Sequence, residues 1–413
     1  MDEQVLVGID IGTTKICTLV GREEPPNHLR IVGVGIEPSQ GIRKGVIVDL
    51  EAASQAVTRS IDKAERTSGL EINSALVSLA GSNVSSTNSR GVVGVSGQII
   101  DQEDIIRSVE AARAIAIPHN REIVHVIQRG FNVDGQEGIR MPVGMHGYRL
   151  EVETHIISAT AASVENVRQC VNKSGIEVSQ FVLNPLASGE VVLTETERQM
   201  GVVVCDVGGG TTDMAIYVDG DVWHTAVLAV GGNHITSDIA QGLRLPMSQA
   251  EEIKIQHGHC MEGEVDARQF FNVRPFGEQD PIQISLKELV NIISARVEEI
   301  FSLVVQEIKR SGYDGLLPAG MVLTGGSSVL PGMRNLASKV LGVPVRVAQP
   351  ENLVGMTDRL NSPAFSTSVG LLRWGLMMSE VISQDGQGRR RIKIETKGGE
   401  WESVKSWLRR LLP

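Results

Sequence analysis

The chain has 413 residues, of which 41% are hydrophobic and 21% charged, and its formal net charge at pH 7 is -10. This length predicts two domains with insertions. The acidic balance and an aromatic content of only 3% argue against nucleic-acid binding. No signal peptide opens the sequence and no apolar run reaches the ~18 residues of a membrane span, so a cytoplasmic protein is expected.

The first part of the chain predicts three strands, at residues 5–11, 15–20 and 30–36. The segment between the second and third strands, residues 21–28, is rich in proline and charge. Strands joined by such short turns form an antiparallel meander, because a parallel pair would need a long crossover. Apolar residues at helical spacing then predict a helix over residues 50–67.

The same pattern returns near the middle of the chain. A strand at 201–207 leads into Gly208–Asp213, and strands at 214–218 and 222–230 follow. Both copies therefore run strand, Asp-x-Gly, two threonines, strand. Two short Gly/Thr turns could resemble each other by chance, but the matching strands on both sides favour an internal duplication.

Residues 82–160, between the two copies, are expected to form an insert. A Ser/Asn-rich stretch opens it, and its pattern predicts a helix at 101–116, strands at 119–133 and 149–158, and loops at 134–138 and 141–147. After the second copy, helices are predicted at 248–256 and 285–310, and a strand at 321–323. Residues 383–399 lack periodicity and are rich in Gly, Gln, Arg and Lys, which indicates a linker.

The repeated turn has the chemistry of a phosphate site. Glycine lets backbone N–H groups approach an anion closely, threonine hydroxyls add donors, and a lysine supplies a point charge. An aspartate at the end of the strand cannot bind phosphate, but it can hold the waters of a Mg²⁺ ion. Two such turns facing each other would clamp a triphosphate. The candidate residues are Asp10, Gly12, Thr13, Thr14 and Lys15 in the first copy, and Asp206, Gly208, Gly209, Gly210, Thr211, Thr212 and Asp213 in the second.

These residues resemble the two phosphate loops of the actin, sugar-kinase and heat-shock-chaperone superfamily. Thr324-Gly325-Gly326 is similar to its adenosine motif, and Glu251 with Lys254 is similar to its Glu-x-x-Lys pair for ribose and base. The resemblance implies ATP and Mg²⁺ as ligands and an α/β, actin-like fold with two lobes, each related to ribonuclease H. It adds Gly232, Asn233, Glu251, Lys254, Gly325, Gly326 and Ser327 to the expected nucleotide site.

Several stretches resemble the FtsA-like branch of this superfamily in particular. They are GNHITSDIA at 232–240, AEEIK at 250–254, EGIRMPVG at 137–144 and FSTSVGLL at 365–372, and the insert lies at the FtsA position. The implied division is a first core lobe at 1–81 and 161–195, the inserted subdomain at 82–160, a second core lobe at 196–233 and 315–382, a small lobe at 234–314, a linker at 383–400 and an amphipathic helix at 401–413.

The motifs that bind nucleotide do not by themselves predict hydrolysis. Related ATPases also position the attacking water, with a Gln or Glu before the middle helix. Here the corresponding residue is Asn184, whose amide cannot act as a general base. Asp10 and Asp206 remain to order waters and Mg²⁺. Tight ATP binding with slow or negligible turnover is therefore expected. A sugar or acetate kinase would need a general-base aspartate, and a chaperone would need a substrate-binding domain after residue 380.

The end of the chain predicts a lipid anchor. From Gly386 onward, eight Lys and Arg stand against three Asp and Glu, in contrast to the acidic body. On a helix, the apolar residues would occupy an arc of about 140°, with basic residues outside it, which is typical of binding to anionic lipid. Docking back onto the body is the alternative. The apolar residues are Trp401, Val404, Trp407, Leu408, Leu411 and Leu412.

The FtsA-like resemblance implies partners. Such proteins self-associate into actin-like protofilaments, tie the tubulin-like FtsZ to the cytoplasmic face of the inner membrane at the division site and help recruit later division proteins. The FtsZ tail would contact the small lobe, where Arg296 on the helix at 285–310 is the candidate residue, with Ile292 and Leu303 beside it away from the core. The alternative is a surface arginine paired with Glu299. The pilus-assembly relative PilM is also FtsA-like but generally lacks the terminal helix.

Overall fold

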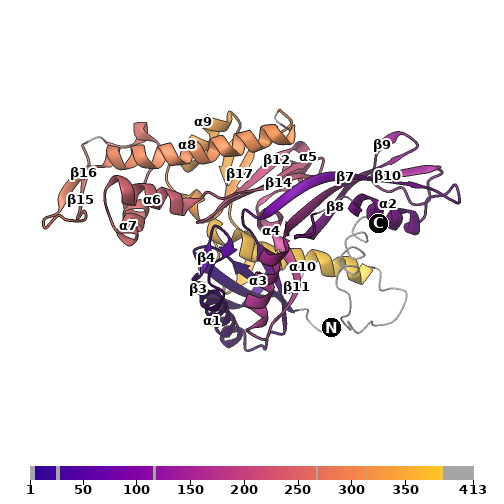
Figure 1. Ribbon diagram of the computed structural model, residues 1–413, viewed down its shortest axis with the longest axis horizontal. Helices are drawn as coiled ribbons and strands as arrows, with labels where there is room; N and C mark the ends of the chain where they lie inside the picture. The colour runs from indigo at the N-terminus through magenta and orange to yellow at the C-terminus, as the bar shows by residue number, and fades with distance from the viewer. Residues whose placement is uncertain (1–4, 25–27, 115–117, 267, 314, 385–413) are drawn as a thin grey trace.

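The computed structural model describes residues 5–24, 28–114, 118–266, 268–313 and 315–384. Two lobes each contain a mixed β-sheet, and helices α4 (Asn184–Val192) and α10 (Ser366–Gln384) cross between them (Figure 1). The first sheet has the strand order β11-β6-β1-β2-β3-β19 and the second β14-β13-β12-β17-β18. This is the α/β, actin-like architecture that the resemblance implied.

The two sheets share one topology at their centres. In the first, antiparallel strands β1 (Val5–Ile11), β2 (Lys15–Glu24) and β3 (His28–Pro38) form the meander, and β6 (Ser74–Leu79) runs parallel to β1. In the second, β12 (Val202–Val207), β13 (Thr212–Val218) and β14 (Asp221–Leu228) repeat this meander, with β17 (Met321–Thr324) parallel to β12. The predicted duplication is therefore confirmed.

Helix α1 (Leu50–Ser68) covers the first sheet and follows the predicted periodicity. The Asp49 side chain caps its N-terminus by accepting from the N–H groups of Glu51 and Ala52. Gly69 ends it with φ 69°. The helix packs close to β3, since a β-carbon placed on Gly35 would lie 1.8 Å from the Ser60 carbonyl oxygen. Helix α3 (Ala161–Asn172), strand β11 (Glu177–Leu183) and the short pair β4 (Ile42–Arg43) and β5 (Val46–Ile47) complete this region.

The insert folds around a four-stranded sheet of order β7-β10-β8-β9, with α2 against it (Figure 1). The sequence predicted no element for the Ser/Asn-rich stretch, which is the long strand β7 because its ladder with β10 outweighs its low β-propensity. One expectation was wrong here. The predicted loop 134–138 contains the start of β9, because Asp134 and Gly135 both have positive φ and form a tight hairpin. The bounds are β7 (Val84–Gly94), α2 (Gln102–Arg113), β8 (Arg121–Val133), β9 (Gln136–Ile139) and β10 (Arg149–Thr160).

The insert also contacts the second lobe, along the outer strand β14. The Ser86 hydroxyl donates to the Thr225 carbonyl at 2.8 Å, and His155 Nε2 lies 3.0 Å from the Thr225 hydroxyl. The guanidinium of Arg129 stacks over Trp223 at 3.7 Å from the ring centroid. The insert thus spans from the first lobe, which contains it in sequence, to the edge of the second.

The small lobe shares one continuous core with the second sheet. Helix α8 (Leu286–Ser311) runs almost where the sequence predicted it, from the Ser285 cap to Gly312 at φ 78°. Its buried face contains the predicted stripe of Ile293, Val297, Ile300, Phe301, Val304 and Ile308. Helix α6 and the hairpin β15-β16 lie outside the predicted elements. The bounds are α6 (Gly232–Gly242), α7 (Met247–His257), β15 (Phe270–Val273) and β16 (Ile282–Ser285).

The last described segments contribute strands to the sheets of both lobes. Strand β19 (Leu353–Gly355) pairs with β3 in the first sheet, although the sequence division placed it in the second lobe. Helix α10 extends to Gln384, so the first two residues of the predicted linker are helical. The rest of the linker and the predicted anchor lie outside the described residues. The remaining elements are α5 (Glu195–Met200), α9 (Met333–Leu341) and β18 (Val345–Val347).

Candidate functional site

A cavity of about 480 Å³ lies where the two repeated turns meet. Its walls come from both lobes, from the small lobe, and from the segment that enters α10. Nearly every residue expected to bind nucleotide lines it: Asp10, Gly12, Thr13, Thr14, Lys15, Asn184, Asp206, Gly208, Gly209, Gly210, Thr211, Asp213, Gly232, Asn233, Glu251, Lys254, Gly325, Gly326 and Ser327. Thr212 is not part of the lining, because it lies in β13 with its hydroxyl donating to the Val230 carbonyl at 2.8 Å.

The two turns have the same backbone geometry. In the first, the Gly12 N–H donates to the Lys15 carbonyl at 3.0 Å, and in the second the Gly208 N–H donates to the Thr211 carbonyl at 2.9 Å. The turns also touch across the cleft. A β-carbon placed on Gly209 would lie 2.3 Å from Thr14 Cγ2. The contact between the loops therefore requires glycine, which also leaves backbone N–H groups free to approach an anion.

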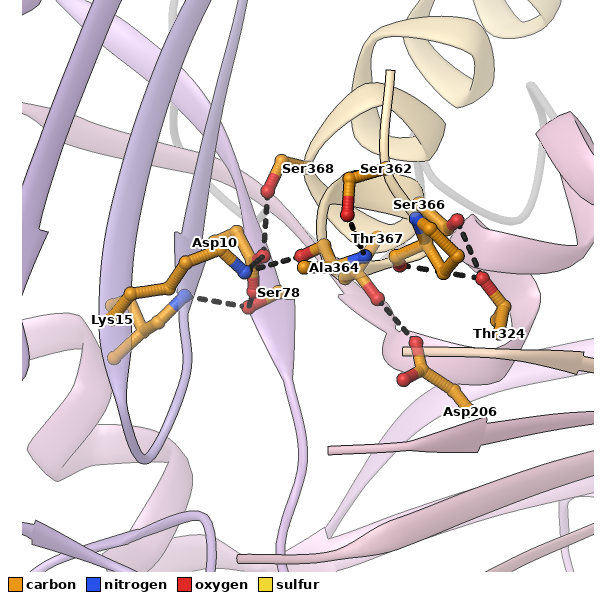
Figure 2. Close-up of polar contacts among 12 residues, drawn as sticks. Asp10, Lys15, Ser78, Asp206, Thr324, Ser362, Ala364, Ser366, Thr367 and Ser368 are labelled. Atoms are coloured by element: carbon orange, nitrogen blue, oxygen red, sulfur yellow. Dashed lines mark hydrogen bonds and ion pairs between the residues drawn. The ribbon is translucent and has the colours of Figure 1, made fainter. Parts of the chain in front are cut away.

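Two aspartates end the central strands, one in each lobe (Figure 2). Asp10 accepts from the hydroxyls of Ser78 at 3.1 Å and Ser368 at 2.7 Å. Asp206 accepts from the hydroxyl of Thr367 at 2.8 Å. Both carboxyl groups are buried, with residue exposures of 5% and 7%. The sequence pattern had assigned both aspartates to this site but none of the three hydroxyl groups that hold them.

Burial dominates the electrostatics at the floor of the cavity. Desolvation, with a smaller contribution from the charge of Asp10, raises the pKa of Asp206 to about 6. Desolvation and the neighbouring Asp206 raise the pKa of Asp213 well above its ordinary value. Asp213 Oδ2 accepts from Thr211 at 2.8 Å. Its Oδ1 and the side-chain oxygen of Asn184 are buried and receive no hydrogen bond within the described part of the chain.

These residues fit a hydrated Mg²⁺ ion. Buried carboxylates are unfavourable unless a cation or hydrogen-bond donors compensate them. Lys15 Nζ lies 4.0 Å from Asp10, yet it donates to the Ala364 carbonyl and sits 4.7 Å from the centroid of Phe365. The unfilled acceptors on Asp213 and Asn184 suit the waters of a hard cation, which prefers oxygen ligands.

The far wall of the cavity combines a polar pair with apolar side chains. Lys254 Nζ lies 2.7 Å from the Glu251 carboxylate and donates to the hydroxyl of Thr236 at 2.9 Å. Ile255 and Val329 line the same wall and are 71% and 59% exposed. An open apolar wall beside hydrogen-bonding groups suits a flat aromatic base. The sequence reasoning missed these apolar residues, since nothing in their local pattern separates them from ordinary core positions.

The two glycines of the adenosine-like motif differ, because only Gly325 has a positive φ. Gly325 has φ 87°, and a β-carbon there would lie 2.3 Å from Asp206 Oδ1. At Gly326 a β-carbon would meet only Ala364 Cβ, at 3.7 Å. Gly325 therefore serves the backbone path, whereas Gly326 keeps the cavity open.

Arg296 lies in the small lobe and is already paired there. Its guanidinium donates to both carboxylate oxygens of Asp238, at 2.5 and 2.9 Å, and to Glu299 at 2.5 Å. The Glu299 pair was the alternative expectation, while Asp238 was not anticipated. Ile292 packs against the hydrophobic core, so its expected position away from the core was wrong. Leu303 is half-buried.

Comparison with known proteins identifies the family. Residues 203–370 match the family model described as cell division protein FtsA, and residues 81–158 match the SHS2 domain inserted in FtsA. The chain is 39% identical over 406 residues to cell division protein FtsA of Pseudomonas aeruginosa, covering 98% of this chain and 97% of the relative. It is 36% identical over 417 residues to the Escherichia coli K12 protein of that name, covering 99% and 98%.

Solved structures support the fold. The PilM-PilN type IV pilus biogenesis complex matches with a TM-score of 0.65 at 17% identity, covering 90% of this chain and 98% of that one. MreB 5 of Spiroplasma citri bound to AMPPNP matches with a TM-score of 0.57 at 15% identity, covering 93% and 100%. These structural likenesses show the actin-like architecture. The sequence relatives match over nearly the full length of the chain and identify its family: this chain belongs to the FtsA family of cell-division proteins.

Proposed function

We propose that the chain binds Mg²⁺-ATP in the cavity between its lobes. The observation that carries this proposal is the convergence of both repeated turns, the Glu251–Lys254 pair and Gly326 on one cavity of about 480 Å³. MreB 5 of Spiroplasma citri, with the same fold, has been solved with ADP and with AMPPNP. When bound, Mg²⁺ would neutralise phosphate charge.

Each part of the site has a task in this proposal. The N–H groups of the two glycine turns would donate to the phosphates, with the hydroxyls of Thr13 and Thr14 beside them. Asp10 and Asp206 would hold the waters of Mg²⁺. Glu251 and Lys254 would contact the ribose and base next to the exposed apolar wall.

Turnover is proposed to be slow. Asn184 lines the cavity near the buried carboxyl of Asp213, but an amide has no basic site to remove a proton from water. ATP would then serve mainly as a structural ligand that holds the lobes together. Of the described carboxylates that line the cavity, Asp10, Asp206 and Asp213 are buried and Glu251 is paired with Lys254, so none of these four is freely exposed toward a sugar hydroxyl. This geometry argues against a sugar or acetate kinase.

The cellular role proposed here follows from family membership. The chain would polymerise through its insert, bind the FtsZ tail with its small lobe and help recruit later division proteins at the cytoplasmic face of the cell membrane. Among the described residues, no helix has the length and hydropathy of a membrane span. Attachment would rely on residues 401–413, whose apolar and basic residues favour anionic lipid. Polymerisation would strengthen this weak anchor through multivalency.

Because Arg296 is already paired with Asp238, the proposed contact with FtsZ requires this arginine to exchange carboxylate partners. An acidic tail would have to compete with Asp238 and Glu299 for the guanidinium of Arg296. The side chain is still 25% exposed, so an incoming carboxylate can reach it. Exchange of one carboxylate for another gains little energy, so the affinity of the tail would depend on its apolar residues as well.

The decisive experiment measures ATP affinity by isothermal titration calorimetry with Mg²⁺, for the parent chain and for Gly326→Asp. The proposal expects the variant to lose binding, since the new carboxylate would occupy the nucleotide's space and repel its phosphates. Thermal unfolding followed by circular dichroism on the same two proteins serves as the folding control, and liposome sedimentation should not change, because the proposed lipid anchor is remote from Gly326 in sequence. Equal ATP affinity in both proteins would show that the cavity is not the nucleotide site.

A further inference from the structure

The first turn of α10 consists of three hydroxyl residues that reach three different strands (Figure 2). Ser368 donates to Asp10 at the end of β1, at 2.7 Å, and Thr367 donates to Asp206 at the end of β12, at 2.8 Å. The hydroxyl of Ser366 lies 2.6 Å from that of Thr324 at the end of β17. One helical turn therefore contacts both lobes.

This use of hydroxyl groups is unusual for the start of a helix. Ser and Thr at helix N-termini generally bond to the backbone of their own helix, as Ser285 does at the start of α8 with the Lys287 N–H at 3.2 Å. Successive helical residues point about 100° apart, so three neighbours can address three separate partners. All three hydroxyl residues are buried, with exposures of 0%, 6% and 0% along the chain.

Helix α10, which carries these hydroxyls, packs closely against both α4 and β1. A β-carbon placed on Gly370 would lie 1.9 Å from the Ala187 carbonyl oxygen, so α10 and α4 pack backbone to backbone. A β-carbon on Gly8 would lie 2.9 Å from Leu371 Cβ, so β1 also packs directly against α10. Because α10 is packed this tightly, it cannot move with one carboxylate without disturbing its hydrogen bond to the other.

We propose that Thr367 and Ser368 are positioning residues, which hold Asp206 and Asp10 ready for a hydrated Mg²⁺ and couple the two lobes to that cation through α10. The two buried carboxylates repel each other, and a hydroxyl donor on each stabilises its charged form and fixes its rotamer. The cation then meets preorganised ligands instead of reorienting them. This inference rests on the proposed nucleotide site.

The test compares ATP affinity with Mg²⁺ and with EDTA, by calorimetry, for Thr367→Val, Ser368→Ala and the parent chain. Each variant removes one hydroxyl donor with little change in volume. Loss of a hydrogen bond to a charged group predicts that the Mg²⁺-to-EDTA affinity ratio falls about tenfold. Thr367→Ser, which keeps the hydroxyl, should restore the ratio of the parent.

Ser366→Ala is the matched control, because it removes a buried hydroxyl from the same turn but faces Thr324 instead of a carboxylate. It should keep the Mg²⁺-to-EDTA ratio of the parent even if it lowers thermal stability. The inference is overturned if Ser368→Ala and Thr367→Val keep the parent's ratio, or if Ser366→Ala loses as much as they do. If the parent itself binds no ATP, the proposed function fails first and this inference fails with it.

Discussion

Replacing Asp206 with asparagine should stabilise the nucleotide-free protein at neutral pH. The pKa of this carboxyl is raised from 3.8 to about 6 in the folded chain, mainly by burial. The folded state therefore keeps the proton between pH 3.8 and 6, where the unfolded chain has released it. By linkage, the contribution of Asp206 to stability is greatest below pH 3.8, declines as pH rises from 3.8 through about 6, and stays lower above that.

The size of this loss follows from the same two values. At about 1.4 kcal/mol for each pH unit, the rise from 3.8 to about 6 corresponds to a penalty of about 3 kcal/mol at neutral pH. Asparagine has no charge to bury, and its amide oxygen can still accept the hydrogen bond from Thr367. Removal of the charge also lowers the pKa of Asp213, because Asp206 is one of the causes of its rise. Both effects favour the variant at pH 7.5.

The assay is urea denaturation in EDTA without nucleotide, followed by circular dichroism between pH 4 and pH 8. The Asp206→Asn variant should equal the parent near pH 4 and exceed it by up to about 3 kcal/mol at pH 7.5. Asp280→Asn, in an exposed position between β15 and β16, is the control and should follow the parent at every pH. The reasoning is refuted if Asp206→Asn is the less stable protein at pH 7.5, or if its advantage does not depend on pH.

Gly326→Ala should keep ATP binding, in contrast to Gly326→Asp, because its β-carbon meets only Ala364 at 3.7 Å, and loss of binding in both would implicate the backbone instead. Trp407→Glu, or removal of residues 401–413, should leave the protein in the supernatant with anionic liposomes, and salt should weaken binding of the parent; a truncated protein that still sediments would place the anchor elsewhere. Arg296→Glu should weaken an FtsZ tail peptide at least tenfold, about 1.4 kcal/mol, in fluorescence anisotropy, without changing ATP affinity; equal peptide affinity would move the contact to another part of the small lobe.

Short-range sequence patterns were enough to predict the repeated turns, two of the helices and the family of this protein. The strand–turn–strand repeat depends on glycines and threonines within a few residues of one another, so both phosphate-like turns could be found and placed opposite each other. The helices α1 and α8 follow from apolar periodicity that buries one face. The family-specific stretches, such as FSTSVGLL at 365–372, then pointed to the FtsA branch, which the full-length relatives bear out.

Other features could not be predicted from the sequence, because tertiary packing overrides local propensity in them. The strand β7 is rich in serine and asparagine, and only its ladder with β10 makes it extended. The short strand β19 pairs with β3, more than 300 residues earlier, so no local signal could assign it to the first sheet. The hairpin at Asp134-Gly135 was the exception, since its turn residues are a local signal that the sequence interpretation overlooked.

The polar contacts of the site required the fold altogether. Ser368 is 358 residues from Asp10, and Thr367 is 161 from Asp206, so their convergence depends on how α10 crosses between the lobes. The pairing of Arg296 with Asp238 likewise joins two helices that are 58 residues apart. A sequence determines directly the conformations that neighbouring residues impose on one another. Which distant side chains meet is decided only when helices and sheets pack, because burial of their apolar faces sets the orientation of every polar group attached to them.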